Sequence, residues 1–191
     1  MIKNKYEFTQ FLEIELGRDY SDIKNWFYYL MTTSTKSYIR ILRKTEYYTN
    51  QGGLYHKIIS KYYKFRLQRQ SVSTGISIPI NVCDKGLTIY HYGSIVVNGA
   101  CKIGKNCCIS NNVNIGATGG STKAPIIGDD VYIGPGAVIF GDISIADGCY
   151  IGANAVVCKS IQEPHSVVVG VPAKIIKKDY VVWWKKNNLN R

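Results

Sequence analysis

An aliphatic residue recurs at every sixth position through the middle of the chain, and this spacing constrains the fold more than any other feature. The series runs over residues 97–157, and only Ser121 interrupts it. An α-helix repeats every 3.6 residues and a strand every 2, so neither produces a period of six. The repeat therefore predicts a parallel β-solenoid whose coils consist of short flat segments. The aliphatic positions are Val97, Ile103, Ile109, Ile115, Ile127, Ile133, Ile139, Ile145, Ile151 and Val157.

Two other features keep the same phase. Glycine follows the aliphatic position at 104, 116, 128, 134 and 152, where the missing Cβ lets the backbone turn a corner. Small or β-branched side chains stand two positions before it. We expect these side chains and the aliphatic series to point inward, so that each coil buries its apolar face against the next. The small or β-branched set is Cys101, Cys107, Val113, Val131, Ala137, Ile143, Cys149 and Ala155.

The chain divides into three predicted parts: a helical N-terminal domain at 1–75, the solenoid at 76–172 and a helical tail at 173–191. Within the first part, amphipathic spacing predicts helices from about residue 4, after Ser21 or Asp22, from about Thr35, and over 54–70. The long interval between Ile115 and Ile127 makes residues 118–124 either an irregular flat face or a protruding loop. Their Gly, Ser and Thr content favours the loop.

The net charge of +11 is unevenly distributed, with +7 on residues 1–75, −1 on 76–172 and +5 on 173–191. Basic flanks on a neutral scaffold suggest an anionic ligand and an anionic surface as partners. No recognised nucleic-acid module accompanies the charge, so we expect no nucleic acid. The basic, tyrosine-rich helix at 54–70 has two interpretations, a cap that packs neighbouring subunits or a contact with anionic lipid.

The remaining composition indicates a cytoplasmic protein without disulfides or a metal. The six cysteines form no CxxC pair, and three of them occupy inward positions, where a thiol acts as a small apolar group. The three histidines are too scattered to suggest a metal cluster. No apolar run approaches the roughly 20 residues of a membrane span, and the first residues lack a signal-peptide pattern. We therefore expect a cytoplasmic location, with peripheral contact at the inner membrane face through the basic helices.

The repeat is flanked by two motifs, GLTIYHYGSIVVNG at 86–99 and VVVGVPAKII at 167–176. Together they resemble the left-handed β-helix (hexapeptide-repeat) acyltransferases, within them the serine acetyltransferase-like branch, over about residues 76–178. The segment IPIN at 78–81 is similar to that of polysaccharide O-acetyltransferases. The resemblance implies a mainly β fold with a left-handed parallel β-helix. It also implies a homotrimer and acetyl-CoA as the acyl donor, with no metal.

His91 matches the catalytic histidine of these enzymes. Acyl transfer from a thioester to an alcohol needs a base, because a neutral hydroxyl is a poor nucleophile, and neutral imidazole suits this role. The other interpretation is a core histidine, since 91 lies on the six-residue phase. The resemblance leaves open whether Asp84 or a backbone carbonyl orients the ring.

The other candidate residues also follow from the resemblance. Tyr90, Tyr92, Asn111 and Asn112 are the candidate acceptor-binding residues, although asparagine is equally common at a turn. The lysines of the coenzyme set would hold phosphates or else lie on a solvated helix face. A backbone N–H of Ala117 or Thr118 would act as an oxyanion donor. The coenzyme set is Ala117, Thr118, Pro135, Ala153, Cys158, Lys159, Lys174 and Lys177.

Three positions depart from the serine acetyltransferase pattern. Ile76 and Tyr90 stand where the family has aspartates, and Ala124 stands where it has a second histidine. Free serine needs partners for its ammonium and carboxylate groups, so these changes favour a bulkier alcohol. The sequence therefore predicts O-acetylation of a sugar in a cell-surface polysaccharide or its precursor. The alternatives are a serine O-acetyltransferase and an inactive β-helix scaffold subunit.

Overall fold

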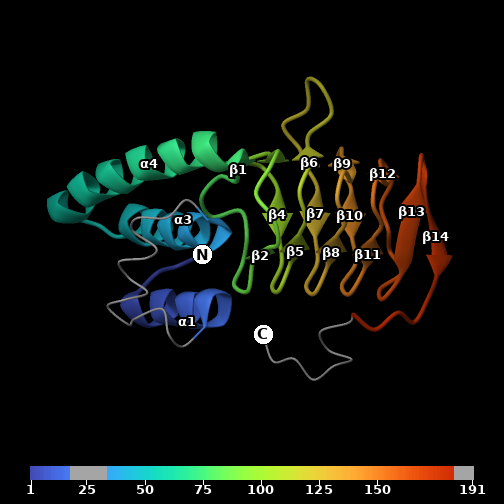
Figure 1. The fold of residues 1–191 in the computed structure, drawn as a ribbon, viewed down its shortest axis with the longest axis horizontal. Coiled ribbons are helices and arrows are strands. Elements are labelled where there is room, and N and C mark those ends of the chain that lie inside the picture. The colour runs from blue at the N-terminus through green and yellow to red at the C-terminus, as the bar shows by residue number, and fades with distance from the viewer. Residues whose placement is uncertain (18–33, 183–191) are drawn as a thin grey trace.

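The computed structural model of the protein describes residues 1–17 and 34–182. Within them, an N-terminal group of helices stands at one end of a long stack of short strands (Figure 1). The helices are α1 (Lys5–Leu16), α3 (Thr35–Asn50) and α4 (Leu54–Thr74). The helix expected after Ser21 or Asp22 lies outside the described residues. No helix of the described chain combines the length and the apolar character that crossing a membrane requires.

Side-chain caps and glycine set the helix boundaries. The Asn4 side chain accepts the N–H of Glu7 at 2.9 Å, and the Ser34 side chain accepts the N–H of Ser37 at 3.1 Å. These bonds satisfy backbone donors that the first helical turn leaves unpaired. Gly75 ends α4 with φ of 73°, in the left-handed region that favours glycine. The starts of α3 and α4 therefore agree with the sequence prediction, and α3 packs against both other helices.

Three sheets, which we name I, II and III, form the faces of the strand stack. From β3 onward each strand pairs with the strand three places later, up to β9 with β12, so successive strands belong to successive faces. Ile126 pairs with Ser144, eighteen residues later, which is three segments of six. Sheet I contains β1 (Ile76–Ser77), β3 (Ile95–Val97), β6 (Val113–Gly116), β9 (Val138–Phe140) and β12 (Val156–Val157). Sheet II contains β4 (Lys102–Ile103), β7 (Ile126–Ile127) and β10 (Ser144–Ile145). Sheet III contains β2 (Thr88–Ile89), β5 (Cys108–Ile109), β8 (Tyr132–Ile133), β11 (Tyr150–Ile151), β13 (Val167–Gly170) and β14 (Ala173–Lys177).

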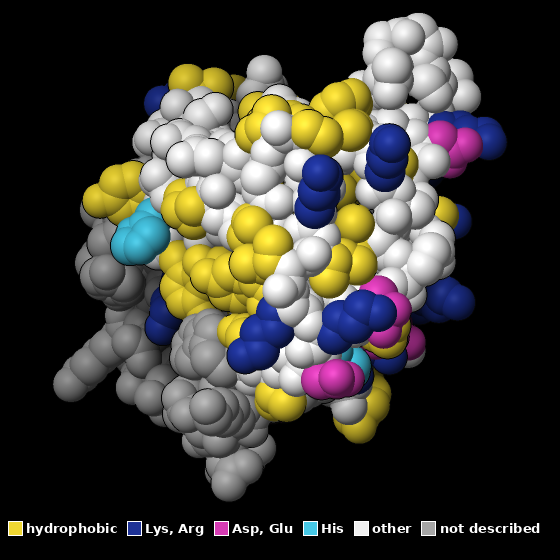
Figure 2. Space-filling model, turned by 90° about the vertical axis from the view of Figure 1, so that its right-hand side faces the viewer, with side chains coloured by type: hydrophobic (Ala, Val, Ile, Leu, Met, Phe, Trp, Pro, Cys, Tyr) yellow, Lys and Arg dark blue, Asp and Glu magenta, His cyan; other side chains and the backbone are white. Residues whose placement is uncertain are grey.

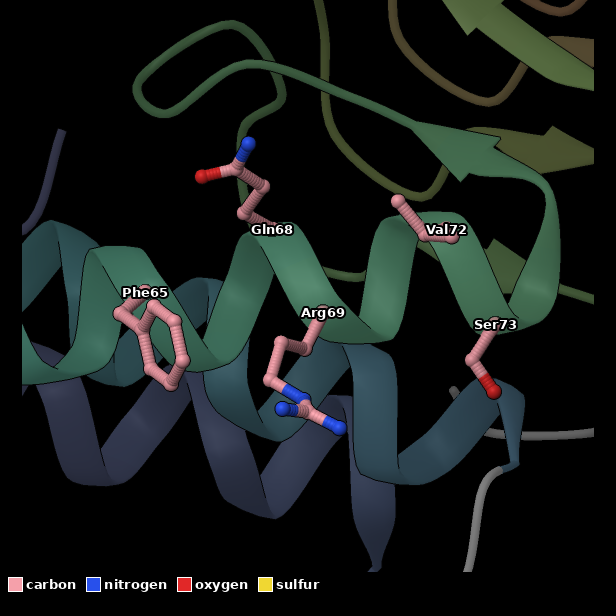
Figure 3. A pocket seen from close by; sticks show the side chains of 5 residues that line it. All are labelled: Phe65, Gln68, Arg69, Val72 and Ser73. Carbon is pink, nitrogen blue, oxygen red and sulfur yellow. The ribbon is translucent and has the colours of Figure 1, made fainter.

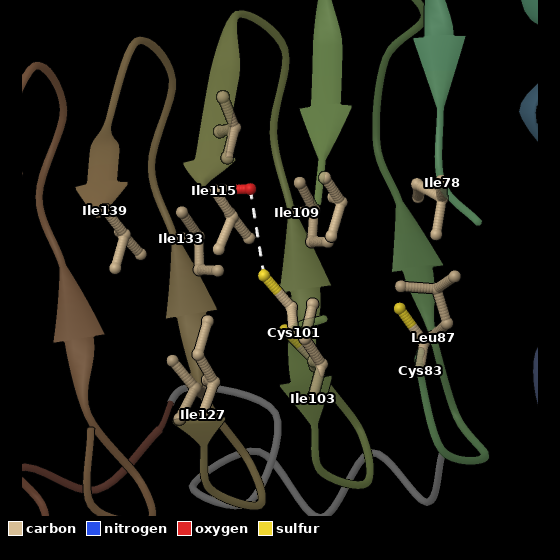
Figure 4. Close-up of a cluster of buried hydrophobic side chains, with 14 of the residues drawn as sticks. Ile78, Cys83, Leu87, Cys101, Ile103, Ile109, Ile115, Ile127, Ile133 and Ile139 are labelled. Carbon is tan, nitrogen blue, oxygen red and sulfur yellow. Dashed lines mark hydrogen bonds between the residues drawn. The ribbon is translucent and has the colours of Figure 1, made fainter. Parts of the chain in front are cut away.

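The aliphatic series forms the core of the stack. All ten positions are at most 3% exposed, and the small or β-branched set is buried with them. Equivalent residues of successive coils lie side by side in rows, as Ile103 and Ile127 or Ile109 and Ile133 do in Figure 4. Burying one such side chain stabilises the fold by about 1.5–3 kcal/mol relative to exposure. The predicted fold class, a mainly β protein with a left-handed parallel β-helix and N-terminal helices, is confirmed.

The cysteines on inward positions are small apolar groups, as the sequence predicts. Burial raises the pKa of Cys83 to about 12 and that of Cys101 to about 11. The thiols of Cys107 and Cys149 also have raised pKa values, for the same reason. These thiols stay protonated at neutral pH, and protonated thiols are poor nucleophiles.

The interruption at Ser121 is a protruding loop, so the loop interpretation is confirmed. Lys102 of β4 pairs with Ile126 of β7, twenty-four residues later, whereas a regular coil takes eighteen. The additional six residues leave the coil between β6 and β7, and Figure 1 shows them rising above the stack. Residues 118–123 are exposed, while Ala124 and Pro125 return to the coil and are buried.

The C-terminal part corrects one prediction. Residues 173–177 form strand β14, which pairs antiparallel with β13, and residues 178–182 are irregular, so 173–182 are not helical. The Val171–Pro172 peptide turns the chain back, and the free edge of sheet III then offers hydrogen-bond partners that a helix would not use. The expected helix around Trp183 lies outside the described residues. The division of the chain at residues 75 and 172 stays a prediction.

A buried guanidinium joins the helices to the β-helix. Arg43 of α3 donates to Glu15 of α1 at 2.6 Å and to Glu46 at 2.8 Å. It also donates to the backbone carbonyls of Cys83 and Asp84 in the first coil at 2.9 and 2.8 Å. Burial lowers the pKa of Arg43, but the two carboxylates raise it further, so the group stays charged. Burial raises the pKa of the Glu15 carboxyl, and the Arg43 charge opposes this.

Replacing Arg43 tests this joint. Arg43→Met leaves Glu15 and Glu46 as buried carboxylates without their cation, so we expect a loss of about 3–5 kcal/mol in the free energy of unfolding. Urea denaturation followed by circular dichroism measures the loss. Lys123→Met is the control, because it removes an exposed ion pair with Asp142 at 2.6 Å, and such pairs contribute little. Equal losses of unfolding free energy in the two variants would contradict the conclusion that Arg43 joins the helices to the β-helix.

Candidate active site

The corner between β2 and β3 carries His91 and is longer than its neighbour. Ile89 pairs with Ile109 and Ile95 pairs with Val113. Ile89 and Ile95 are six residues apart, whereas their partners in the next coil are only four residues apart. The two additional residues make the corner bulge outward, and His91 is exposed there. The interpretation of His91 as a core residue is therefore wrong, because the insertion moves it off the inward phase.

The corners of later coils stack beside this bulge and bring several candidate residues together. A Cβ placed on Gly93 would lie 3.4 Å from the Asn111 Cβ and 3.9 Å from the Asn112 side-chain oxygen. The N–H of Gly136 donates to Asn111 at 3.0 Å, and the N–H of Asn154 donates to Pro135 at 2.9 Å. The "His91 column" is therefore the row of corners at residues 90–94, 111–112, 135–136 and 153–154.

Backbone geometry gives the asparagines of this column a structural reason. Asn112 has φ of 57° and Asn154 has φ of 56°, and Gly136 occupies the same left-handed region at 72°. Asparagine and glycine tolerate that region better than other residues. Asn112 therefore has a structural role in the turn. Asn111 does not have positive φ, so the turn does not require asparagine there. Their role at an acceptor stays a prediction.

The end of α4 is bonded to the His91 corner. The N–H of Gly93 donates to the Thr74 carbonyl at 2.9 Å, and the N–H of Ile95 donates to the Gly75 carbonyl at 3.0 Å. The two backbones approach so closely that a Cβ on Gly75 would lie 3.0 Å from the Gly93 carbonyl carbon. A glycine is needed at this position, which also has positive φ, and the contact fixes the corner relative to the helices.

Of the two tyrosines beside His91, Tyr92 is 68% exposed and Tyr90 is half-buried. Tyr90 packs in a row of rings on the outer face of sheet III. Centroid distances along the row are 6.4 Å to Tyr132, 4.5 Å from there to Tyr150 and 5.4 Å onward to Tyr180. The chain segment after β14 thus covers sheet III. Tyr132 and Tyr150 are eighteen residues apart, which is the length of one coil, and this spacing in the sequence could have indicated the row.

A second group of candidates lies on the opposite edge of sheet I. Ala117 and Thr118 follow β6, and Cys158 and Lys159 follow β12, at the corner that leads to sheet II. The span from residue 112 to residue 117 along one strand is about 16 Å, at roughly 3.3 Å per residue. A backbone N–H of Ala117 therefore does not meet the His91 ring of the same chain. Within one chain the predicted site is split between two corners.

Lys174 and Lys177 are exposed on strand β14, so the interpretation of a solvated helix face is wrong. Figure 2 faces this end of the molecule and shows lysine or arginine side chains interspersed with apolar ones. Strand β14 lies five positions from β2 in sheet III, about 24 Å at roughly 4.8 Å per strand. A ligand that touches both His91 and these lysines must therefore be long.

Nothing in the described residues hydrogen-bonds to the His91 ring, and Asp84 is not placed to do so. Its carboxylate accepts the N–H of Lys85 at 2.8 Å, at the opposite edge of sheet III from His91. Among the described residues, no three His, Cys, Asp or Glu side chains gather in a way that could hold a metal ion.

The chain is similar to known proteins in sequence and in structure. Residues 124–159 match the bacterial transferase hexapeptide (six repeats) family. A serine acetyltransferase of Staphylococcus aureus (strain Mu50) is 37% identical over 111 residues, 56% of this chain and 52% of the relative. One from Staphylococcus xylosus is 40% identical over 109 residues, 56% of this chain and 50% of the relative. The chain thus spans about half the length of these curated relatives.

Solved structures extend the likeness to the helices. The chain is similar to a serine acetyltransferase from Brucella abortus strain S19, with a TM-score of 0.70 and 26% identity over 93% of this chain and 72% of that one. A Neisseria gonorrhoeae serine acetyltransferase in complex with serine gives a TM-score of 0.67 and 25% identity over 91% and 70%. The chain resembles the serine acetyltransferases in sequence and in fold. A second structure of the Brucella abortus enzyme, solved in complex with coenzyme A, gives a TM-score of 0.68 and 25% identity over 93% of this chain and 71% of that one.

The three departures from the serine acetyltransferase pattern have a consistent structural character. Ile76 is fully buried in β1 and pairs with Ile95, and Ala124 is 6% exposed where the loop rejoins the coil. Tyr90 packs on Tyr132. None of the three therefore presents a carboxylate or an imidazole to the exposed corner that carries His91.

Proposed function

We propose that the protein transfers an acetyl group from acetyl-CoA to a hydroxyl group, with His91 as the general base. The observation that carries this proposal is the exposed imidazole on the bulged corner of a β-helix that resembles the serine acetyltransferases. A ring on the surface can meet two substrates at once, which a core residue cannot do.

The reaction follows from this placement. The unprotonated His91 nitrogen takes the proton of the acceptor hydroxyl while the hydroxyl oxygen attacks the thioester carbonyl carbon. The new C–O bond forms and the C–S bond breaks. The imidazolium then returns the proton to the coenzyme A sulfur, so the products are an acetyl ester and the free thiol.

Acetyl-CoA suits the long path between His91 and β14. Its thioester stands at one end and its phosphates at the other, joined by a pantetheine arm. In this proposal the arm runs along the His91 column past Pro135 and Ala153, and Lys174 and Lys177 bind the phosphates. The coenzyme A complex of the Brucella relative supports the choice of donor.

A homotrimer completes the site. Ala117, Thr118, Cys158 and Lys159 lie on the opposite edge of sheet I from His91, so a neighbouring copy supplies them. Cyclic symmetry places the same pair of edges together at every interface. Val96 on the outer face of sheet I is 44% exposed, which suits a face that packs against a neighbour.

The acceptor has two candidates. Serine is the one that the comparisons support better, since the relatives are serine acetyltransferases and one was solved with serine. The hydroxyl of a sugar in a cell-surface polysaccharide or its precursor is the second. The specific observation in its favour is that Ile76 and Ala124 are buried and apolar, so neither pairs with an ammonium or a carboxylate group. A cytoplasmic location accompanies either acceptor.

The first experiment distinguishes the acceptors. Release of free thiol from acetyl-CoA is measured against serine and against a panel of nucleotide sugars, lipid-linked repeats and polysaccharide. We expect release with a hydroxyl acceptor from this set. Preference for serine identifies a serine O-acetyltransferase, and preference for a glycan identifies the sugar enzyme. An inactive scaffold subunit predicts no release with any acceptor, and that result would refute the proposed function.

The second experiment tests the base. His91→Ala removes the proton acceptor, so kcat should fall by about 10²–10⁴ while the fold is retained. His165→Asn is the matched control, because His165 is also exposed at a corner and its φ of 53° suits asparagine. We expect the control to stay within about twofold of the wild type, since His165 does not touch the column. Unchanged kcat in His91→Ala would exclude general-base catalysis by this residue.

A further inference from the structure

Helix α4 buries several polar side chains and leaves several large apolar ones exposed. Its inward face includes Ser60, Gln70 and Thr74, which are at most 9% exposed. These side chains are hydrogen-bonded: Ser60 to Thr49 at 2.8 Å, and Gln70 to Ser37 at 3.0 Å. Its outward face is apolar, with side chains 53–84% exposed. The outward residues are Leu54, Tyr55, Ile58, Tyr62, Phe65 and Val72.

The outward residues form one continuous surface, which we name the α4 stripe. Positions 55, 58, 62, 65, 69 and 72 recur at alternating intervals of three and four, so they lie along one side of the helix. Near its end the stripe contains a shallow groove of about 430 Å³ (Figure 3). Its lining residues are Phe65, Gln68, Arg69, Val72 and Ser73. Contiguous exposed apolar surface of this kind marks an interaction site, unlike single exposed residues.

The charge of α4 selects the kind of partner. The helix contains five basic residues and no acidic one. The guanidinium of Arg66 lies 5.9 Å from the Tyr62 ring centroid, and that of Arg69 lies 5.9 Å from the Phe65 centroid. Cations therefore border the apolar stripe along its length. The basic residues are Lys57, Lys61, Lys64, Arg66 and Arg69.

A second copy of α4 is a poor partner for this surface. The spacing of the stripe is that of a coiled-coil seam, in which Lys61 of one helix would face Arg66 of a parallel copy. Like charges at such positions are destabilising, and α4 has no carboxylate to relieve them. Arg69 would also stand within the apolar seam. An extended anionic surface satisfies both the cations and the apolar side chains.

We propose that the α4 stripe docks on an anionic lipid bilayer. The aliphatic and aromatic side chains enter the boundary between headgroups and acyl chains, and the lysines and arginines contact the anionic headgroups. Because Thr74 is bonded to Gly93, docking holds the His91 corner close to the membrane surface. The binding itself does not depend on the acetyl transfer proposed above.

Vesicle co-sedimentation of the full chain tests this inference. We expect binding to vesicles of three parts phosphatidylcholine and one part phosphatidylglycerol, weaker binding in high salt, and little binding to phosphatidylcholine alone. Ile58→Ser combined with Phe65→Ser should raise the lipid concentration for half-binding at least roughly tenfold. Replacing Lys57, Lys61 and Lys64 with Gln should weaken binding and remove most of its salt dependence.

Matched controls lie elsewhere on the molecule. Val171→Ser combined with Ile176→Ser removes side chains that are 72% and 64% exposed at the far end, and should leave binding unchanged. Replacing Lys85, Lys102 and Lys105 with Gln removes the same charge from the β-helix, again with no effect expected.

Three results would overturn the inference: absence of binding, equal binding to neutral and anionic vesicles, or equal loss in the control variants. Sedimentation velocity tests whether a second copy of the chain, rather than a bilayer, covers the α4 stripe. If Ile58→Ser with Phe65→Ser changes the oligomeric state and leaves vesicle binding unchanged, the stripe contacts a second copy and the inference fails. Acetyl transfer to a soluble acceptor should be unchanged when Ile58→Ser and Phe65→Ser are combined, so failure of the inference is separable from failure of the proposed function.

Discussion

The stacking of inward aliphatic side chains from coil to coil is the constraint on which the rest of the structure depends. Each coil buries its apolar face only against its neighbours, so every coil must repeat the same path of three flat segments. Additional residues have no place inside this path and must leave it. The chain departs outward at the corner 90–94 and at the loop 117–125. The first of these departures carries His91, so the regular core determines where chemistry is possible.

Two of the contacts that attach the helices to this core differ in their physics. At one point Arg43 supplies charge and hydrogen bonds in a buried setting, joining α1, α3 and the first coil. At the other, the end of α4 meets the His91 corner through backbone hydrogen bonds, and Gly75 permits the close approach. The second joint places a helix with an apolar outer face next to the candidate active site. The end of α4 therefore helps to fix the position of the His91 corner.

The sequence predicted the core more completely than the site, for identifiable reasons. A strict period of six specifies inward and outward positions, so the buried residues, the coil length and the loop at Ser121 follow from it. Apart from Glu46 on the same helix, the partners of Arg43 lie 28, 40 and 41 positions away in the chain, and no local pattern encodes that meeting. The helical tail expected over 173–191 is wrong at its start, because residues 173–177 pair with the edge of sheet III as a strand.

The candidate site shows the same limit at finer scale. His91, Asn111 and Pro135 lie in one column although they are 20 and 24 residues apart, because one interval contains the two-residue insertion and the other the six-residue loop in addition to a coil of eighteen. The exposure of His91 depends on a two-residue insertion. This insertion can be recognised only when the partners of Ile89 and of Ile95 in the next coil are known. Ala117 and Lys159 lie across sheet I from His91, so the chain by itself does not bring them to the imidazole ring.

Hydrogen–deuterium exchange of the protein with and without coenzyme A tests the central claim most directly, namely that the outward departures and the His91 column form the donor site. The account predicts slower exchange on binding at residues 90–94, 117–118, 135–136 and 153–159 and along β14. The corners between sheets II and III, such as 104–106 and 128–130, should be unchanged. Protection confined to those corners, with the segment 90–94 unaffected, would contradict it.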